Sequence, residues 1–441
     1  MEAVERAGHQ AVVGIGRTGV RWRWGLLGGL AVVALLLIIS AAHIVTTIDA
    51  RLREWDDFTP YWSGASSVAA GHSPYAWLAE HRPQEVPDYI YPPLLALLLA
   101  PVVPFVEYPT ARWAWLALNA ACLVVALLLV WRVSGLRVDG PRAMALAPLL
   151  VLLPTATSAL GAGTLSPALT CATAAAFAAV LARRAGLAGG LVAVGAYLKS
   201  FPALLGGYLL LRREWRAAWA TFGAGLVLLA ASLLTLGWEP HWVYLTGVIP
   251  AQRRWFGMPL NVSVTGLFTR LFSDSGFGTP VVDAPAFAEG AITATSAVLL
   301  VASAYAIWRA RAGAAGAAAA FGLAVVTMLL LSPINGQYNL VIALVPLAVA
   351  AAAVQQAWPR HLRWLLLITL LLSLPVEPCD LGPLRDACVG PEGLASGLPW
   401  RAGWGSLLIT GPLWGLVALG ALLFRLCTEP SRPGQSITDP Q

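Results

Sequence analysis

The stretch Trp55-Asp56-Asp57-Phe58-Thr59-Pro60-Tyr61 follows the first long hydrophobic run of the chain, which extends from Gly25 to Ala42. The polar loop that it opens ends at Asp88-Tyr89-Ile90-Tyr91-Pro92-Pro93, where hydrophobic sequence resumes. Carboxylates are costly beside a lipid bilayer, so acidic residues held between two hydrophobic spans indicate a functional site. The stretch therefore predicts helices that cross a membrane. It also predicts a polar site in the loop that follows the first of these helices.

Composition supports a membrane protein. Hydrophobic residues make up 58% of the chain and charged residues 11%, whereas soluble domains are about 45–50% apolar and about 25% charged. Because the apolar runs are long and continuous rather than alternating, they predict helices and not a barrel. The net charge of +6 comes almost wholly from arginines that flank these runs. Such arginines are signals of membrane topology and not of nucleic-acid binding.

The predicted spans follow from the length of the apolar runs, since a transmembrane helix needs about 20 apolar residues. The segment 186–211 is broken by Lys199-Ser200-Phe201-Pro202 and flanked by arginine pairs, so it is predicted to form a short hairpin of two helices. The proline-rich segment 91–109 is predicted to insert only partly. The remaining spans are expected at 25–43, 110–131, 143–160, 165–182, 217–236, 287–308, 314–331, 337–353, 361–375 and 404–426.

About twelve crossings result, with both chain ends in the cytoplasm. Residues 1–24 form a cytoplasmic tail, residues 25–426 the membrane domain, and residues 427–441 a disordered cytoplasmic tail. The arginine clusters then lie inside. The unusual polar segments fall on the exterior, namely the loops 44–91, 237–286 and 376–403, the tip 161–164, Lys199 and the segment 332–339.

The five cysteines have no metal-type spacing. Cys122, Cys171 and Cys427 are expected as buried small residues within or beside the spans. Cys379 and Cys388 share an exterior loop and form either a disulfide or two free thiols. The sequence has no Walker loop and no soluble nucleotide-binding unit, and we expect neither a cofactor nor a metal ion.

Two charged features are candidates for chemistry. Asp57, with Asp56 as the alternative, is suited to removing a proton from an attacking hydroxyl. The competing interpretation is a pair of solvated acids or a helix N-cap. Lys199 is the only lysine in the chain, and its compact ammonium group suits a phosphate oxygen. The competing interpretation is a lysine that snorkels from a helix end.

Two further segments carry polar side chains at the same predicted face. Exterior arginines in the loop 237–286 run against the positive-inside tendency, and an anionic lipid phosphate would explain them; a solvated loop with a short amphipathic helix is the alternative. In Ser332-Pro333-Ile334-Asn335-Gly336-Gln337-Tyr338-Asn339, the amides either orient sugar hydroxyls or satisfy helix ends. The candidates in the loop are His241, Arg253, Arg254, Asn261, Ser263 and Arg270.

Several motifs in consistent order resemble the GT-C superfamily of membrane glycosyltransferases. They are Asp57-Phe58-x-x-Tyr61-x-x-x-Ala65, Gly71-His72-Ser73-Pro74-Tyr75, Tyr91-Pro92-Pro93-Leu94, Lys199-x-x-Pro202 with Arg212-Arg213-x-Trp215-Arg216, and Asn261-x-Ser263-x-x-Gly266-x-x-x-Arg270. Together they are most similar to glycosyltransferase family 87, the polyprenyl-phosphate-mannose-dependent α-1,2-mannosyltransferases. One departure is that this chain has Gly336 to Asn339 where the family often has tryptophan and histidine after Ser-Pro-Ile.

The resemblance implies an all-α GT-C fold with juxtamembrane helices in its exterior loops, placed in a bacterial plasma membrane. It implies an inverting transfer of a sugar, most simply mannose, from a polyprenyl phosphate to a hydroxyl of a glycolipid or polysaccharide. Asp57 would be the base, with Asp56 as the fallback. Phosphate binding is expected of Lys199, Arg270, Arg253 and Arg254, and substrate binding of Tyr61, Tyr91, His241, Asn261, Asn335, Gln337 and Tyr338.

Two rival functions remain open at this point. A transporter or flippase of lipids or lipid-linked sugars would also combine many spans with buried charge, although the internal repeats common in such folds are not evident. A non-catalytic membrane scaffold would leave the ordered motifs without a reason.

Overall fold

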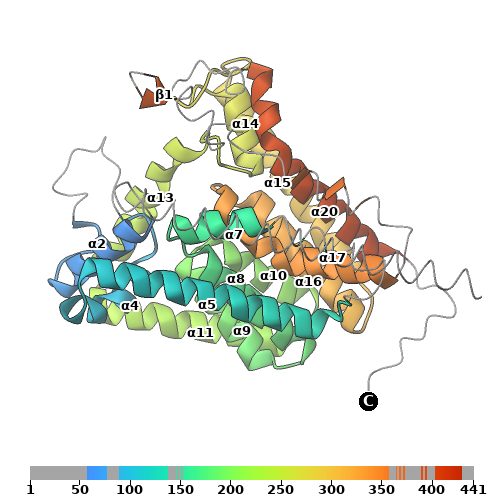
Figure 1. Ribbon diagram of the computed structural model, residues 1–441, viewed down its shortest axis with the longest axis horizontal. Helices are drawn as coiled ribbons and strands as arrows, with labels where there is room; N and C mark the ends of the chain where they lie inside the picture. The colour runs from blue at the N-terminus through green and yellow to red at the C-terminus, as the bar shows by residue number, and fades with distance from the viewer. Residues whose placement is uncertain are drawn as a thin grey trace, which may run out of the picture.

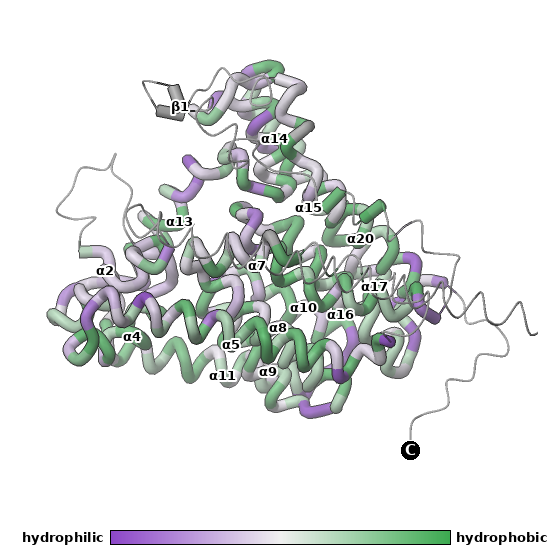
Figure 2. Tube along the Cα trace, in the orientation of Figure 1, coloured by the Kyte–Doolittle hydropathy of each residue, from purple (hydrophilic) through white to green (hydrophobic). Residues whose placement is uncertain are grey.

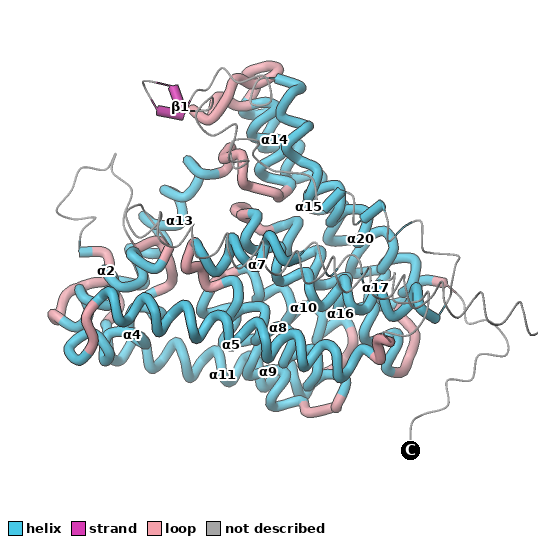
Figure 3. Tube along the Cα trace, viewed as in Figure 1, coloured by secondary structure: helices cyan, strands magenta, loops and turns pink. Residues whose placement is uncertain are grey.

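The computed structural model describes residues 57–76, 89–137, 152–356 and 403–429, with isolated residues or pairs between 146 and 394. The predictions for Asp56, for the first span and for the pair Cys379 and Cys388 lie outside the described residues. Nearly all of the described secondary structure is helical (Figure 3). The strands described are β1 (Val389–Gly390) and β2 (Gly393–Leu394), which pair antiparallel.

Figure 1 shows the helices packed along one body, with α14 standing beyond it at the end of α15. The helices of the first half are α2 (Phe58–Ala69), α4 (Pro93–Leu99), η1 (Ala100–Phe105), α5 (Tyr108–Ser134), α7 (Leu152–Gly161), α8 (Ser166–Leu181), α9 (Ala185–Leu198), η3 (Phe201–Ala203) and α10 (Leu204–Leu211). Those of the second half are α11 (Trp215–Leu236), α12 (Glu239–Val243), the π-helical turn η4 (Tyr244–Val248), α13 (Ile249–Ala251), η5 (Gln252–Trp255), α14 (Val264–Phe272), α15 (Pro285–Arg309), α16 (Ala314–Leu331), η6 (Gln337–Ala343), α17 (Leu344–Gln356), η10 (Gly403–Thr410) and α20 (Gly411–Thr428).

The described part has six helices long and apolar enough to cross a membrane: α5, α11, α15, α16, η6 with α17, and α20. The predicted span 314–331 coincides with α16, and four of the others lie within three residues of their predicted bounds. The span predicted at 404–426 is observed as α20, which begins seven residues later because residues 403–410 form η10. Shorter apolar helices occur at Pro93–Phe105, α8, α9 and Phe201–Leu211. The prediction of an all-α, multi-pass membrane protein is confirmed, while the count of twelve crossings stays a prediction.

The core surrounds α16, most of whose residues are buried. Phe321 of α16 lies 5.4 Å from Phe177 of α8 and 5.2 Å from Tyr208 of α10, measured between ring centroids. In contrast, α5, α11 and α15 expose large apolar side chains, such as Leu128, Val227 and Val301. Figure 2 shows this apolar character along the outer helices. Such surfaces fit a hydrocarbon environment.

The predicted hairpin at 186–211 is present. Gly189 packs against Ala217 and Thr221, and Gly225 lies beside Tyr197, so α9 and α11 run parallel. The helix α10 lies between them in the chain and therefore runs back. The reversal occurs at Lys199, whose extended backbone ends α9 before the short helix η3.

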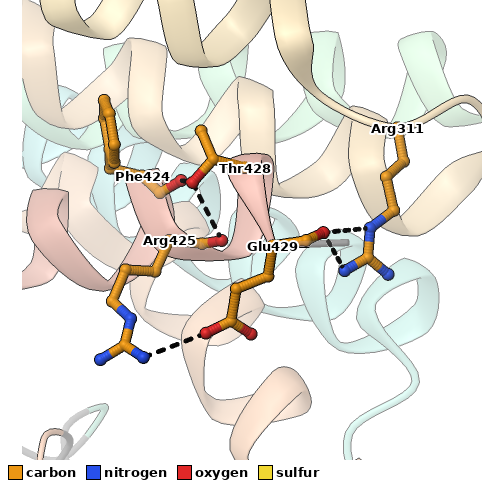
Figure 4. Close-up of polar contacts among 5 residues, drawn as sticks. All are labelled: Arg311, Phe424, Arg425, Thr428 and Glu429. Carbon is orange, nitrogen blue, oxygen red and sulfur yellow. Dashed lines mark hydrogen bonds and ion pairs between the residues drawn. The ribbon is translucent and has the colours of Figure 1, made fainter. Parts of the chain in front are cut away.

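Arginines gather where this hairpin returns, and we call this the arginine end. Arg212 donates to the carbonyl oxygens of Ile307, Ala310 and Arg311, at 3.3, 2.6 and 3.0 Å. Arg311 in turn donates to the carbonyl oxygen of Glu429 at the end of α20 (Figure 4).

Figure 4 also shows how α20 ends. Arg425 donates to the carboxylate of Glu429 at 3.1 Å, and the hydroxyl of Thr428 bonds the carbonyl oxygen of Phe424 at 3.0 Å. The opposite end of the helices carries Lys199 and the segment 332–339, and we call it the site end.

The cysteine predictions are partly tested. Cys427 is buried, as expected, whereas Cys122 and Cys171 are half-buried. The latter two lie on the neighbouring helices α5 and α8. All three are free thiols.

Candidate functional site

Asp57 is fixed at the site end through its backbone. Its amide donates to the carbonyl oxygen of Ala162, at 2.9 Å, in the turn between α7 and α8. The neighbouring carbonyl of Gly163 accepts the indole N–H of Trp115 at 2.8 Å. Asp57 stands at the N-terminus of α2, but its side chain does not cap that helix. The structure therefore does not support the N-cap interpretation of this carboxylate.

Tyrosine hydroxyls hold the backbone of residues 89–96. Tyr75 donates to the carbonyl oxygen of Tyr91, and Tyr89 donates to that of Pro92 at 2.6 Å while accepting the amide of Ala96 at 2.9 Å. These bonds orient the Tyr91 ring, which meets the ring of Tyr61 edge-on with centroids 4.7 Å apart.

Two contacts complete this loop. Gln252 of η5 donates to the carbonyl oxygen of Ile90 at 3.0 Å, which ties the loop 237–286 to it. On α2, a Cβ at Gly64 would come within 2.5 Å of the Tyr89 ring. The absent side chain is therefore what allows that ring to lie flat against the helix.

Lys199 lies in the turn between α9 and η3, outside both helices. Its ammonium nitrogen is 3.3 Å from the amide oxygen of Asn339. It also lies over the rings of Tyr91, Phe201 and Tyr338, at 5.9, 5.8 and 5.4 Å from their centroids. Aromatic faces attract a cation without neutralising it, so these rings leave the charge of Lys199 in place.

The ionisation of Lys199 reflects this setting. Burial lowers the pKa of its ammonium group from the ordinary value to about 8, and the nearby Asp57 carboxylate acts in the opposite direction. Burial also raises the pKa values of Tyr61 and Tyr91 well above the ordinary value, and Asp57 adds to both shifts. These phenols stay neutral hydrogen-bonding groups around one carboxylate.

Asn339 is fully buried and connects three elements. Its amide oxygen accepts from the Ser166 hydroxyl at 2.6 Å, as well as from Lys199. Its amide nitrogen has no hydrogen-bond partner within the described residues. A buried donor left without a partner is costly, so this N–H group points to a bound ligand or water.

The structure thus brings together Asp57, Tyr61, Tyr91, Lys199, Tyr338 and Asn339, which we call the Asp57–Lys199 site. The Tyr338 ring packs closely against the backbone of Gly336, where a Cβ would lie 2.5 Å from the ring. A carboxylate, an ammonium group and neutral phenols converge here. Such a set can move a proton and stabilise a negative charge at the same place.

The motif from Asn261 to Arg270 has a different role. The Asn261 amide nitrogen donates to the carbonyl oxygens of Phe256 and Pro333, both at 2.9 Å, and its oxygen accepts the Asn335 amide at 2.9 Å. Asn261 is fully buried, and both its amide nitrogen and its amide oxygen are hydrogen-bonded to backbone groups. It fixes the segment 332–339 rather than facing substrate.

Ser263, Gly266 and Arg270 support Asn261. The Ser263 hydroxyl caps α14 by accepting the Gly266 amide at 3.0 Å, and Gly266 packs directly on Asn261. Arg270 is buried and donates to the carbonyl oxygens of Met258 and Asn261 at 3.0 and 2.9 Å. Its Nε and Nη2 atoms have no partner within the described part of the chain.

The other predicted site residues are more scattered. Both ring nitrogens of His241 are engaged locally, at 2.9 Å from the Ser232 hydroxyl and the Gly237 carbonyl. Arg253 is exposed and pairs with Glu289 at 3.8 Å.

Three residues keep polar groups near the segment 332–339 or its neighbouring loop. Arg254 lies over the Trp255 ring and has a buried Nε atom without a partner among the described residues. The amide group of Asn335 is fully buried and equally without a partner there. Gln337 is half-buried and bonds the Leu260 carbonyl through its backbone amide.

Ser166 and the amide of Asn339 were not among the predicted site residues. Asn339 had a signal, since it ends the polar interruption 332–339 between apolar spans. Ser166 had none, because a serine before proline at the start of an apolar run also indicates a helix N-terminus.

The described helices and the polar side chains gathered at the site end are those of a membrane protein with a candidate site for a polar ligand. Comparison with known proteins agrees: the model of glycosyltransferase family 87 matches residues 89–333, more than half of the chain. The protein belongs to this family and is a membrane glycosyltransferase. The match includes Tyr91, Lys199 and Arg270, while Asp57 and Asn339 lie outside it.

A curated relative is an alpha-(1->3)-arabinofuranosyltransferase of Corynebacterium glutamicum, with 31% identity over 115 residues. The aligned part is 26% of this chain and 27% of that protein, so the chain spans about a quarter of the relative's length. No solved structure matches the chain significantly.

Proposed function

We propose that the protein transfers a sugar from a polyprenyl phosphate to a hydroxyl of a glycolipid or polysaccharide. The observation that carries the proposal is the position of Lys199, the only lysine, which contacts Asn339 and three aromatic rings within the electrostatic reach of Asp57, in a chain of a glycosyltransferase family. An ammonium group held by ring faces suits a phosphate leaving group, and a nearby carboxylate suits the attacking hydroxyl.

The reaction is a single displacement at the anomeric carbon. The acceptor oxygen forms a bond to that carbon while the bond from the carbon to the phosphate oxygen breaks. The acceptor proton passes to Asp57, and the polyprenyl phosphate leaves with the bonding electron pair. Lys199 stabilises the charge that develops on the phosphate. One displacement inverts the anomeric centre, so a β-linked donor gives an α-linked product.

The surrounding groups have matching roles. The neutral phenols of Tyr61, Tyr91 and Tyr338 line the space for the sugar. The Asn339 amide nitrogen, which has no partner among the described residues, donates to a sugar or phosphate oxygen. Arg270 keeps two nitrogen positions for a further anionic or hydroxyl group of the substrates. His241 and Asn261 support the fold, because their polar atoms are already bonded within the chain.

The site end faces the exterior of a bacterial plasma membrane in this proposal. The positive-inside tendency supports this orientation, since Arg212, Arg311 and Arg425 gather at the opposite end. The exterior has no nucleotide sugars, and a lipid-carried donor is therefore required there.

Mannose is the first choice of sugar, from the resemblance of the motifs. Arabinofuranose is the second, because the name of the relative from Corynebacterium glutamicum specifies an arabinofuranosyltransferase. Both sugars present hydroxyls to neutral phenols and amides, so the same site chemistry serves either.

The test uses the purified full chain in liposomes. Labelled polyprenyl-phosphate mannose and polyprenyl-phosphate arabinofuranose are supplied separately with membrane glycolipid acceptors, and the products are sized. Transfer of label to an acceptor supports the proposal and selects the sugar. Movement of the lipid donor across the bilayer without transfer would instead establish a flippase.

A further inference from the structure

The turn between α7 and α8 contacts both halves of the Asp57–Lys199 site. The carbonyl oxygen of Ala162 accepts the backbone amide of Asp57 at 2.9 Å. At the start of α8, the hydroxyl of Ser166 donates to the amide oxygen of Asn339 at 2.6 Å, and that oxygen also accepts from Lys199. One short segment therefore holds the backbone of the carboxylate residue and an amide that contacts the ammonium group.

Ser166 is itself held by hydrogen bonds. It is fully buried, and its backbone amide donates to the hydroxyl oxygen of Thr164 at 3.2 Å. The backbone amide of Thr164 donates to the carbonyl oxygen of Ala159, in the last turn of α7, at 3.1 Å. The carbonyl oxygen of Ser166 accepts the Thr170 hydroxyl at 2.7 Å. These bonds fix the backbone from which the Ser166 hydroxyl donates.

The orientation of the Asn339 carboxamide follows from its two neighbours. An ammonium group carries only N–H donors and no acceptor, so the atom that faces Lys199 at 3.3 Å must be the amide oxygen. With the oxygen turned to Lys199, the Ser166 hydroxyl donates to that oxygen as well. The amide nitrogen lies on the other side of the carboxamide and has no partner among the described residues.

This arrangement presents two kinds of donor from side chains in direct contact. They are the ammonium group of Lys199 and the amide N–H group of Asn339. A phosphate group has several acceptor oxygens, so one phosphate can accept from both. Asn339 is fully buried, and an N–H group without a partner is costly there unless a ligand or water accepts from it. A phosphate bound to Lys199 would be such a ligand.

We propose that Ser166 is a positioning residue for the transfer reaction. Its hydroxyl holds the Asn339 carboxamide so that the amide N–H group donates to the phosphate that Lys199 binds. The inference rests on the proposed function, because it assumes a phosphate leaving group. Without the Ser166 bond, the carboxamide keeps only Lys199 as a partner, and its N–H group is held less firmly. A donor fixed before the reaction stabilises developing charge better than one that can turn.

The experiment is a double-mutant cycle with the purified full chain in liposomes and the donor that the wild type transfers. Ser166→Ala should lower kcat about tenfold with the donor KM nearly unchanged, because the phosphate gains charge only as its bond to the sugar breaks. Asn339→Leu should lower kcat about 10²-fold, as the loss of one preorganised donor does. The double variant should be no slower than Asn339→Leu alone, since Ser166 acts through Asn339.

Ser303→Ala is the matched control. Ser303 of α15 is a buried serine outside the Asp57–Lys199 site, and its hydroxyl oxygen lies 2.8 Å from the Thr327 hydroxyl of α16. Each serine variant loses one buried hydroxyl bonded to another side chain, so the two melting temperatures should fall by similar, small amounts. Only Ser166→Ala should lose activity per folded molecule.

The outcomes separate the inference from the reaction. Wild-type kcat in Ser166→Ala, or additive losses in the cycle, would overturn the role of Ser166 and leave the transfer reaction standing. If the Asn339 N–H group binds only a buried water, Asn339→Leu changes the melting temperature but not kcat, which also refutes the inference. Should Asn339→Leu not fold, equal kcat in Ser166→Ala and Ser303→Ala would refute it. No transfer by the wild type would overturn the proposed function and this inference with it.

Discussion

The two ends of the helix bundle use positive charge differently. At the arginine end, Arg212 donates to three backbone carbonyls and Arg311 to the carbonyl of Glu429. At the site end, Lys199 has one amide oxygen, that of Asn339, and three ring faces. A cation bonded to carbonyls holds helix ends together, whereas a cation on ring faces remains able to bind an anion. The difference separates a charge that is bonded within the fold from a charge that is a candidate for binding a ligand.

The largest expected effect comes from the carboxylate at the site end. Asp57→Asn removes the base but keeps the shape of the side chain and the backbone bond to Ala162. General-base catalysis contributes about 10²–10⁴-fold, so transfer should fall by that factor. Donor binding should be nearly unchanged. Initial rates and donor affinity in liposomes measure both quantities.

Asp56→Asn is the control for this prediction. Its rate should stay near that of the wild type. If Asp56→Asn lost activity while Asp57→Asn kept it, the base would be Asp56, and the assignment made here would be wrong.

A direct comparison of the two ends uses Lys199→Met and Arg212→Met. The first should lower kcat/KM by about 10²–10³-fold, because a charge that stabilises the leaving phosphate is lost. It should not lower the melting temperature, since a buried cation costs free energy in the fold. The second should cost about 2 kcal/mol of stability through lost bonds to carbonyls, with the activity per folded molecule unchanged.

Thermal unfolding and kinetics on the same preparations test this pair. The distinction between the ends would disappear if both variants lost stability and activity in parallel.

The pH dependence sharpens the role of Lys199. Its pKa is lowered to about 8 by burial, so the ammonium form that binds phosphate is present below pH 8 and is lost above it. A bound anion favours the charged form of Lys199. The affinity of the enzyme for the donor should therefore weaken by up to about tenfold per pH unit above 8. The KM for the donor, measured from pH 6.5 to 9.5, should show this rise.

Lys199→Arg supplies the comparison, because arginine keeps its charge over that range. Whatever its rate, the rise in KM above pH 8 should be absent from this variant. The same rise in both proteins would assign the titration to another group.

A smaller effect on activity is expected from Gly336, against which the Tyr338 ring packs. Gly336→Ala places a Cβ about 2.5 Å from the Tyr338 ring, so this ring, whose centroid lies 5.4 Å from the Lys199 ammonium nitrogen, must shift. Displacing a group by about 1 Å in an active site can cost about 10²-fold, and we expect a loss of about tenfold in kcat. Gly207→Ala, whose Cβ meets no atom within 4 Å, should have no effect. Equal rates in both variants would show that the position of Tyr338 does not matter.

Much of the fold could be predicted because a membrane imposes a simple length rule. The span 314–331 is observed as α16, and Lys199-Ser200-Phe201-Pro202 marks the hairpin turn, since proline and a charge interrupt an apolar run. The spans that fall on residues 25–43 and most of 361–375 lie outside the described residues. The direction of α10 could also be predicted from the sequence, because the arginine pairs that flank the hairpin place both of its ends on the same side of the membrane.

The site was less predictable, because polarity alone does not reveal the partner of a buried group. Asn261 and Asn339 are both fully buried amides in quoted motifs. The amide nitrogen and oxygen of Asn261 are both hydrogen-bonded to backbone groups. The amide oxygen of Asn339 contacts Lys199, and its amide nitrogen has no partner within the described residues. Sequence reasoning named Asn261 as a substrate-binding residue and included Asn339 only among the amides of the segment 332–339, without a role of its own. Only the three-dimensional contacts distinguish an amide that fixes a loop from one that can face a substrate.

The most direct test of the central claim is a cryo-electron microscopy structure of Asp57→Asn in lipid nanodiscs with the donor that the wild type uses. We predict that the donor phosphate contacts the Lys199 ammonium group and that the anomeric carbon faces residue 57. A phosphate bound at the arginine end, or anywhere out of contact with Lys199, would contradict the account.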